Sequence, residues 1–152
     1  METKIFHPDT DHGTVAAAAE ITRRGGLLGI PTETVYGLGA DALNEEAVRR
    51  IFEAKGRPQD NPLIIHVPLA DWLARYCRDV PPSAYALAER FWPGPLTMIL
   101  PRSAAIPDVV TAGLDTVGVR MPAHKGARRI IELSAPLAAP SSNTSGKPSP
   151  TS

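Results

Sequence analysis

Cysteine, net charge and long apolar runs are all scarce in this sequence. Cys77 is the only cysteine, so an intramolecular disulfide is excluded and nothing marks an oxidising compartment. Lysine plus arginine equal aspartate plus glutamate at 16 each, which excludes a general electrostatic attraction to nucleic acid or to a membrane surface. No stretch approaches the roughly 18 apolar residues of a membrane helix, and no basic segment followed by an apolar run marks a signal peptide. We therefore expect a cytoplasmic protein without a membrane partner.

The residues that are abundant indicate an ordinary globular domain. The 152 residues are 43% hydrophobic and 21% charged, which is unlike the composition of a disordered chain. Two domains would leave two small cores, so we predict a single domain over residues 1–152. The 16 prolines and 12 glycines predict many well-defined turns, because proline fixes φ and glycine reaches conformations that other residues avoid.

Helical and strand patterns alternate through much of the chain. Helices are expected over residues 14–24, 45–54, 70–76, 83–91 and 127–133, with Asn44 as the N-cap of the second. Strands are expected over residues 27–30, 63–67, 96–100 and 116–120, with a very short one at 137–139. A polar loop is expected over residues 32–39, and composition alone gives a flexible tail beyond Pro140. The alternation predicts an α/β fold, with one twisted sheet covered by helices.

Two segments could each direct a pair of polar side chains at one ligand. Lys55-Gly56-Arg57 follows a helix and precedes a proline, and in an extended segment the side chains of Lys55 and Arg57 share a side. Two such cations suit a polyphosphate, although a solvated basic turn is the commoner meaning of this tripeptide. Ser141 and Asn143 follow a short strand at the same spacing, at a place where open α/β sheets bind ligands. A Ser/Asn turn is the alternative for that segment.

Further candidates stand at the ends of predicted strands. Arg120 ends an apolar strand, so its charge needs a partner if it is buried, and a substrate carboxylate would serve. An arginine that reaches solvent is the commoner case. His66 lies in another apolar strand, where a lone histidine usually has a structural partner. The segment after Pro31 contains two glycines and two threonines, which permit close approach to a small polar ligand.

Together these segments form a recognisable pattern. The runs PTETVYGLG, KGRPQDNPLIIH, FWPGPLT, VGVRMPAH and APSSNTSGKPSPT occur in this order, and they resemble the YrdC-like threonylcarbamoyl-AMP synthase family over nearly the whole chain. The hallmark of that family is a Lys-x-Arg pair working with a Ser-x-Asn pair, here Lys55, Arg57, Ser141 and Asn143. The resemblance implies a single YrdC-like α/β domain with a twisted mixed sheet flanked by helices. It also replaces the flexible tail by an ordered segment at least as far as Gly146.

By this resemblance, the enzyme joins L-threonine, bicarbonate and ATP, with Mg²⁺ on the phosphates, to give threonylcarbamoyl-AMP and pyrophosphate. Downstream proteins would use the product for the threonylcarbamoyladenosine modification of tRNA. The positions that match threonine-binding residues are Thr34, His66, Arg120 and Ala139. The positions that match ATP-binding residues are Lys55, Arg57, Asn61, Thr116, Ser141, Asn143 and Ser149. The expected catalytic residues are Lys55, Arg57, Ser141 and Asn143, and no metal-ligand cluster is expected.

Family members continue past the position that matches Ser152, so this chain is expected to lack their C-terminal segment and to turn over poorly without it. Three other functions are weighed. A carbamoyl-transfer domain of hydrogenase-maturation proteins would normally follow zinc-finger modules, and cysteine pairs are missing here. An RNA-binding module would need a basic patch, and the densest cluster is only Lys125, Arg128 and Arg129. The third alternative is an inactive fragment that only binds a ligand or a partner.

Overall fold

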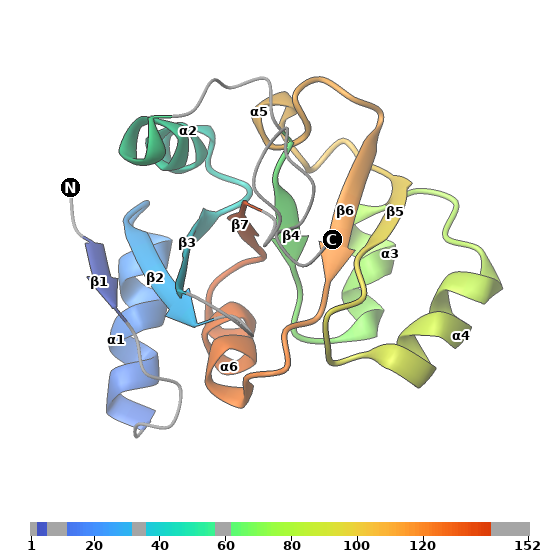
Figure 1. Cartoon of the computed structure of the whole chain (residues 1–152), viewed down its shortest axis with the longest axis horizontal. Helices are drawn as coiled ribbons and strands as arrows, with labels where there is room; N and C mark the ends of the chain where they lie inside the picture. Colours follow the sequence, from blue (N-terminus) through green and yellow to red (C-terminus); the bar gives the residue numbers. More distant parts are fainter. Residues whose placement is uncertain (1–2, 6–11, 32–35, 57–61, 141–152) are drawn as a thin grey trace, which may run out of the picture.

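The computed structural model of the protein describes residues 3–5, 12–31, 36–56 and 62–140 (Figure 1). Within these ranges one mixed sheet has seven strands in the order β1-β2-β3-β7-β4-β6-β5. Neighbours β1 and β2, and neighbours β4 and β6, are parallel, and the other neighbours are antiparallel. The strands are β1 (Thr3–Ile5), β2 (Leu27–Pro31), β3 (Tyr36–Asp41), β4 (Ile64–His66), β5 (Met98–Pro101), β6 (Thr116–Arg120) and β7 (Leu137–Ala139). The helices are α1 (His12–Arg23), α2 (Glu45–Lys55), the 3-10 turn η1 (Ala70–Trp72), α3 (Leu73–Tyr76), α4 (Pro82–Phe91), α5 (Asp108–Thr111) and α6 (Lys125–Leu133).

One face of the sheet is apolar across most of its width. Residues at paired positions of neighbouring strands point to the same face, so the strand register defines which side chains share it. This face packs against α2, α3 and α5 to form the main core, and burial stabilises each of its large side chains by roughly 1.5–3 kcal/mol. The strand residues of the main core include Leu27, Ala40, Ala138, Ile65, Val119 and Met98.

The opposite face is covered by α1 and α6 at the β2 end of the sheet. The two helices are in contact with each other, and Leu28 of β2 packs between Ala19 of α1 and Ile130 of α6 in a second small core. Among the described residues, no helix combines the length and the apolar character that crossing a membrane requires.

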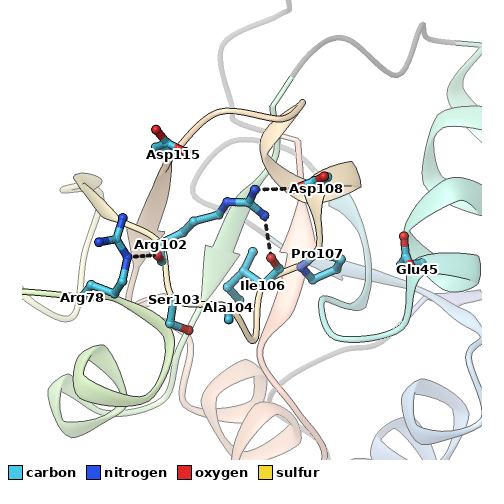
Figure 2. A pocket seen from close by; sticks show the side chains of 9 residues that line it. All are labelled: Glu45, Arg78, Arg102, Ser103, Ala104, Ile106, Pro107, Asp108 and Asp115. Atoms are coloured by element: carbon cyan, nitrogen blue, oxygen red, sulfur yellow. Dashed lines mark hydrogen bonds and ion pairs between the residues drawn. The ribbon is translucent and has the colours of Figure 1, made fainter.

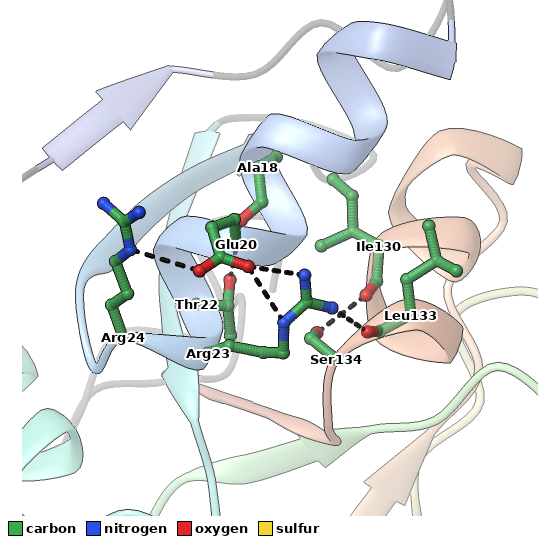
Figure 3. A network of polar contacts seen from close by, with 8 residues as sticks. All are labelled: Ala18, Glu20, Thr22, Arg23, Arg24, Ile130, Leu133 and Ser134. Carbon is green, nitrogen blue, oxygen red and sulfur yellow. Dashed lines mark hydrogen bonds and ion pairs between the residues drawn. The ribbon is translucent and has the colours of Figure 1, made fainter.

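Polar contacts also join α1 to α6 (Figure 3). Arg23, in the last turn of α1, donates to the main-chain carbonyl of Leu133 and pairs with Glu20 at 2.6 Å. Arg24 contacts the other oxygen of Glu20 at 3.2 Å. Hydrogen bonds and charge from Arg23, and then from Arg24, hold the pKa of Glu20 below its ordinary value. Because these groups are exposed, the apolar contacts contribute more than the ion pairs to holding the two helices together.

The start and the buried side of α2 follow the sequence closely. Asn44 is the N-cap, and its side-chain oxygen accepts a hydrogen bond from the N–H of Ala47 at 3.2 Å. Two glutamates occupy the first turn, where the helix dipole favours negative charge. Val48, Ile51 and Phe52 recur at spacings of three and four residues, which places them on one face of the helix, and all three are buried. This helix therefore forms as the capping and periodicity rules predict.

The end of α2 differs from the prediction. Lys55 is the last helical residue, and Gly56 takes the left-handed conformation with φ 64° and ψ 30°. The segment that starts at Lys55 is therefore not extended, and the argument that Lys55 and Arg57 share a side through strand-like spacing is wrong. A left-handed glycine is the usual way in which a helix ends, and it turns the chain away from the helix axis. Arg57 itself lies outside the described residues.

Strand β3 is the main departure from the expected elements. The predicted loop over residues 32–39 is wrong from Tyr36 onward, because residues 36–39 pair with β2, and the last residues of the strand, Ala40 and Asp41, pair with β7. Pairing with β2 outweighs the low strand propensity of Gly37 and Gly39. β1 and α5 were not predicted, since three or four residues are too few for a periodic pattern. Residues 32–35 of the predicted loop, and the predicted tail from residue 141 onward, lie outside the described residues.

Candidate functional site

The face of β4, β6 and β5 that points away from the main core is called the open face here. The register places Ile64 and His66 of β4 on this face, with Gly118 and Arg120 beside them on β6. Ile99 of β5 pairs with Gly118, so it also belongs to the open face, and it is 65% exposed. A single exposed apolar side chain is common on protein surfaces, so the histidine and the arginine on this face are what make it the candidate site.

His66 and Arg120 are neighbours at the carboxyl ends of two parallel strands. They occupy paired positions of β4 and β6, and the N–H of Val67 donates to the carbonyl of Arg120 at 2.9 Å. Both side chains are largely buried, at 9% and 7% exposure. The fold therefore brings together two residues that are 54 positions apart in the sequence, at the sheet end where α/β proteins bind ligands.

The tautomer of His66 follows from its contact with β7. Its Nδ1 lies 3.3 Å from the main-chain carbonyl oxygen of Leu137. A carbonyl oxygen can only accept, so Nδ1 carries the proton in this hydrogen bond. In the neutral ring Nε2 is then the accepting nitrogen, which suits a donor such as an ammonium or hydroxyl group.

Three other positions line the open face. Thr116 begins β6 and is exposed, four residues before Arg120, which corresponds to about 13 Å along the strand. Gly118 lies between them, and a Cβ there would meet Thr97 and Ile99 side-chain carbons at 3.3 and 3.4 Å. Ala139 of β7 pairs with Ile64, so it lies on the same face but two positions along the sheet from His66. Arg120, which is predicted to bind threonine, and Thr116, which is predicted to bind the nucleotide, therefore lie at opposite ends of β6.

A turn between α4 and β5 contacts Arg120 directly. The guanidinium Nε of Arg120 donates to the main-chain carbonyl of Gly94 at 2.8 Å, and the N–H of Gly94 donates to the carbonyl of Met121 at 2.9 Å. The indole N–H of Trp92 closes the same turn by donating to the carbonyl of Leu96 at 2.9 Å. The run FWPGPLT contributed to the family resemblance, but no role was predicted for its residues, because its contact with a strand 26 residues away has no local signal.

The remaining predicted site residues cannot be placed against these. Lys55 ends α2, and its backbone alone is described. The residues that lie outside the described part of the chain are Thr34, Arg57, Asn61, Ser141, Asn143 and Ser149. Their assignment to a phosphate or threonine site stays a prediction.

A pocket of about 570 Å³ lies elsewhere, between α5, the start of α2 and the loop after β5 (Figure 2). Arg102 forms an ion pair with Asp108 and donates to the carbonyl of Ile106 at 2.7 Å, while Arg78 donates to the carbonyl of Arg102 at 2.7 Å. Three carboxylates line this pocket together with the two arginines, and none of the predicted site residues does. Since its cations are already paired with protein groups and acids outnumber them, the pocket does not suit a polyphosphate.

Two partly or fully buried titratable groups have raised pKa values: Asp41 at the end of β3 and Cys77 in the main core. Asp41 ends β3 opposite Leu137; burial raises the pKa of its carboxyl, and the hydrogen bond from the Leu43 N–H, at 2.8 Å, opposes that shift. Burial also raises the pKa of the Cys77 thiol to about 11, so this cysteine is protonated at neutral pH and is a poor nucleophile. Within the described ranges no group of three or more His, Cys, Asp and Glu side chains could hold a metal ion.

One cation of the basic cluster on α6 is engaged by contacts within the protein. Arg128 donates to the carbonyls of Pro122 and Ala123, both at 2.8 Å, so it closes the turn before the helix. Lys125 and Arg129 remain exposed on α6. Two exposed cations in this cluster, on a chain with no net charge, give weak support to an RNA-binding function.

Comparison with known proteins identifies relatives of this chain. The Sua5/YciO/YrdC family model, described as telomere recombination, matches residues 20–152. A threonylcarbamoyl-AMP synthase of Pyrococcus abyssi is 61% identical over 139 residues, which cover 91% of this chain and 41% of that protein. A threonylcarbamoyl-AMP synthase of Bacillus subtilis is 51% identical over 159 residues, covering 99% of this chain and 46% of that protein.

A solved structure agrees in fold as well. The crystal structure of P. abyssi Sua5 complexed with L-threonine is 56% identical to this chain and superposes with a TM-score of 0.86, over 100% of this chain and 45% of that one. The α/β fold predicted from the sequence, a mixed sheet flanked by helices, is confirmed. The chain spans less than half the length of these three relatives.

Proposed function

The chain belongs to the Sua5/YciO/YrdC family, and on this premise we propose that it carries the substrate site of a threonylcarbamoyl-AMP synthase. The reaction joins L-threonine, bicarbonate and ATP and gives threonylcarbamoyl-AMP and pyrophosphate. The product supplies the proteins that complete the threonylcarbamoyladenosine modification of tRNA in the cytoplasm. The names of relatives that are more than half identical to this chain support this function over a hydrogenase-maturation or RNA-binding role.

The observation that carries the proposal is the line of Thr116, Gly118 and Arg120 along the open face. A threonylcarbamoyl adenylate is an elongated molecule with a carboxylate at its amino-acid end and an adenosine at the other. Arg120, held beside His66, suits the carboxylate as a guanidinium donor. Thr116, about 13 Å away along β6, suits the nucleotide end. Gly118 lies between the two ends, where Thr97, Ile99 and Ile64 pack over the strand, so the body of the molecule would lie against these side chains.

The chemistry requires positioning more than proton transfer. The amine of threonine attacks the carbon of bicarbonate and water leaves, which gives a carbamate. A carbamate oxygen then attacks the α-phosphorus of ATP, and pyrophosphate leaves with the electrons of the broken P–O bond. Several negative charges meet in this step, so neutralising and aligning them accounts for much of the acceleration. We assign this role to Lys55 and Arg57, with Ser141 and Asn143 as the neutral donors.

The remaining predicted site residues are assigned either to threonine or to ATP. Threonine is held by Thr34, His66, Arg120 and the main chain at Ala139, and ATP also contacts Asn61, Thr116 and Ser149. We propose Mg²⁺ as an ion carried by the ATP phosphates, as the family resemblance implies. When bound, it would neutralise charge on the leaving pyrophosphate.

Binding and turnover can be tested separately on the 152-residue chain. Calorimetry should detect ATP and L-threonine, with L-serine bound more weakly because it lacks the methyl group, a difference of about 1–3 kcal/mol in a fitted pocket. Turnover is measured as pyrophosphate released from ATP in the presence of Mg²⁺, L-threonine and bicarbonate. A folded chain that binds neither ATP nor L-threonine would refute the proposal.

The Arg57→Ala variant tests the phosphate assignment. Loss of one charge-assisted contact should weaken ATP binding by roughly 1.5–3 kcal/mol while L-threonine affinity stays close to that of the unmodified chain. Arg129→Ala is the matched control, since it removes an exposed arginine of α6. Equal ATP affinity in the two variants would show that Arg57 does not contact the phosphates.

A further inference from the structure

Arg120 is held by a turn that the proposed reaction does not itself require. This turn, called the Trp92–Leu96 turn here, follows α4 and enters β5. Two hydrogen bonds connect it to the end of β6, from Arg120 Nε to the Gly94 carbonyl at 2.8 Å and from the Gly94 N–H to the Met121 carbonyl at 2.9 Å. Since Nε lies within the guanidinium plane, this bond fixes the direction in which the plane and its two terminal nitrogens point.

Gly94 can take this place because it has no side chain. A Cβ at this position would lie 3.0 Å from the main-chain oxygen of Phe91, closer than carbon and oxygen normally approach. The main chain of the turn therefore comes near α4 and β6 at the same point. The direction of the Gly94 carbonyl therefore depends on the contacts that close the turn.

Trp92 closes the turn from within the core. Its N–H in the main chain donates to the carbonyl of Ala88 at 2.9 Å, which ends α4, and its indole N–H donates to the carbonyl of Leu96 at 2.9 Å. The indole is a member of the main core and is 8% exposed. The main-chain bond fixes the start of the turn to α4, and the indole bond ties the end of the turn to the buried ring, so the direction of the Gly94 carbonyl between them is restricted.

We infer that Trp92 is a positioning residue for amino-acid binding: its indole N–H holds the Trp92–Leu96 turn so that the Gly94 carbonyl orients the Arg120 guanidinium toward the substrate carboxylate. The inference rests on the proposed function only for the identity of the ligand. The hydrogen-bonded chain from Trp92 through Gly94 to Arg120 can be tested without any ligand. The inference implies that selectivity for the amino acid depends on Trp92, a residue that does not contact the amino acid.

Trp92→Phe is the test variant, because phenylalanine keeps an aromatic ring in the core and removes the indole N–H. Trp72→Phe is the matched control. Trp72 is the only other tryptophan, it is 7% exposed, and it packs in the same core against Tyr76. The two variants lose the same atoms from similarly buried sites, and urea unfolding should show a loss of stability in Trp92→Phe that is larger by at most the contribution of one hydrogen bond, because that variant also loses the bond to Leu96.

The first readout is binding to the full chain by calorimetry. Trp92→Phe should bind L-threonine about tenfold more weakly than Trp72→Phe, with ATP affinity equal within about twofold. A merely structural role would lower both affinities together, or neither. Equal L-threonine affinity in the two variants, or a parallel loss of ATP affinity in Trp92→Phe, overturns the inference.

The second readout is hydrogen exchange of the Arg120 Nε–H, followed by NMR without ligand. In the unmodified chain and in Trp72→Phe this proton should exchange slowly, because it is buried and bonded to Gly94. In Trp92→Phe it should exchange severalfold faster. Unchanged exchange overturns the positioning role even if L-threonine binds. If exchange is faster in Trp92→Phe but the unmodified chain binds no L-threonine, the positioning role is supported and the proposed function is refuted.

Discussion

Replacing Thr111 by valine is expected to make the protein more stable. Thr111 ends α5 and is 0% exposed, and its hydroxyl oxygen has no hydrogen-bond partner among the described residues. Valine has nearly the same shape, with a methyl group in place of the hydroxyl, and both residues are branched at Cβ. The substitution therefore removes a buried unpaired polar group without opening a cavity.

The size of the effect follows from the cost of the hydroxyl. Burial of a polar group without a hydrogen bond costs about 1–3 kcal/mol in protein mutants. Thr111→Val should recover much of this cost, so we expect the free energy of unfolding to rise by about 1–2 kcal/mol. For a protein of this size, that corresponds to an increase in Tm of about 2–8 °C.

Thr22 supplies the matched control. It is also a helical threonine with 0% exposure, but its hydroxyl donates to the carbonyl of Ala18 at 3.2 Å. Thr22→Val removes a satisfied hydroxyl, so its net effect should be between zero and a loss of about 1 kcal/mol. The two variants therefore should move stability in different directions, although the chemical change is identical.

The assay is urea unfolding of the two variants and the unmodified chain, followed by circular dichroism. A difference of at least about 1 kcal/mol between Thr111→Val and Thr22→Val supports the reasoning. If Thr111→Val is destabilised as much as Thr22→Val, the Thr111 hydroxyl has a partner in solution, such as a buried water. The premise that it is unpaired would then be wrong.

Two further substitutions test groups near the candidate site and in α2. Burial raises the pKa of the Asp41 carboxyl, so the folded protein holds its proton more tightly than the unfolded chain does. The stability of the unmodified protein therefore falls as pH rises from about 4. Asp41→Asn removes this carboxylate but keeps the oxygen that accepts the Leu43 N–H. Urea unfolding should show that the variant loses this part of the pH dependence and is the more stable protein at about pH 7; an identical pH profile would contradict the burial of Asp41. Asn44→Ala should cost about 1 kcal/mol through loss of the N-cap bond to Ala47, whereas Asn44→Ser should retain most of the stability. Equal unfolding midpoints for these two variants would mean that the cap contributes nothing.

How far the sequence predicts this fold depends on how local each signal is. α2 was predicted from its cap and its periodic core face, which lie within one stretch of 12 residues from Asn44 to Lys55. The predicted bounds of β6 and β7 agree with the structure, because prolines or polar residues mark the ends of their apolar runs. β3 was missed because its glycines read as a loop; in the structure they pair with β2, and the last two residues of β3 pair with β7, about 100 residues further along the chain.

The candidate site divides in the same way. The sequence supplied His66 and Arg120 as separate strand-end residues, and the resemblance supplied their role, but their pairing depends on a register between β4 and β6 that no local pattern contains. The predicted geometry of Lys55 and Arg57 failed for the opposite reason. It was a local argument that assumed an extended backbone, and a single left-handed glycine was enough to invalidate it.

For Arg120, the sequence correctly predicted that the side chain needs a partner if it is buried, but it missed one of the partners. The sequence argument held that a buried arginine at this strand end needs a partner, and it nominated a substrate carboxylate. The protein itself supplies one partner, the Gly94 carbonyl at 2.8 Å. A carbonyl is neutral, so this bond satisfies one N–H and orients the guanidinium without cancelling its positive charge. The substrate carboxylate proposed above would add a charged partner to the neutral carbonyl that orients the guanidinium.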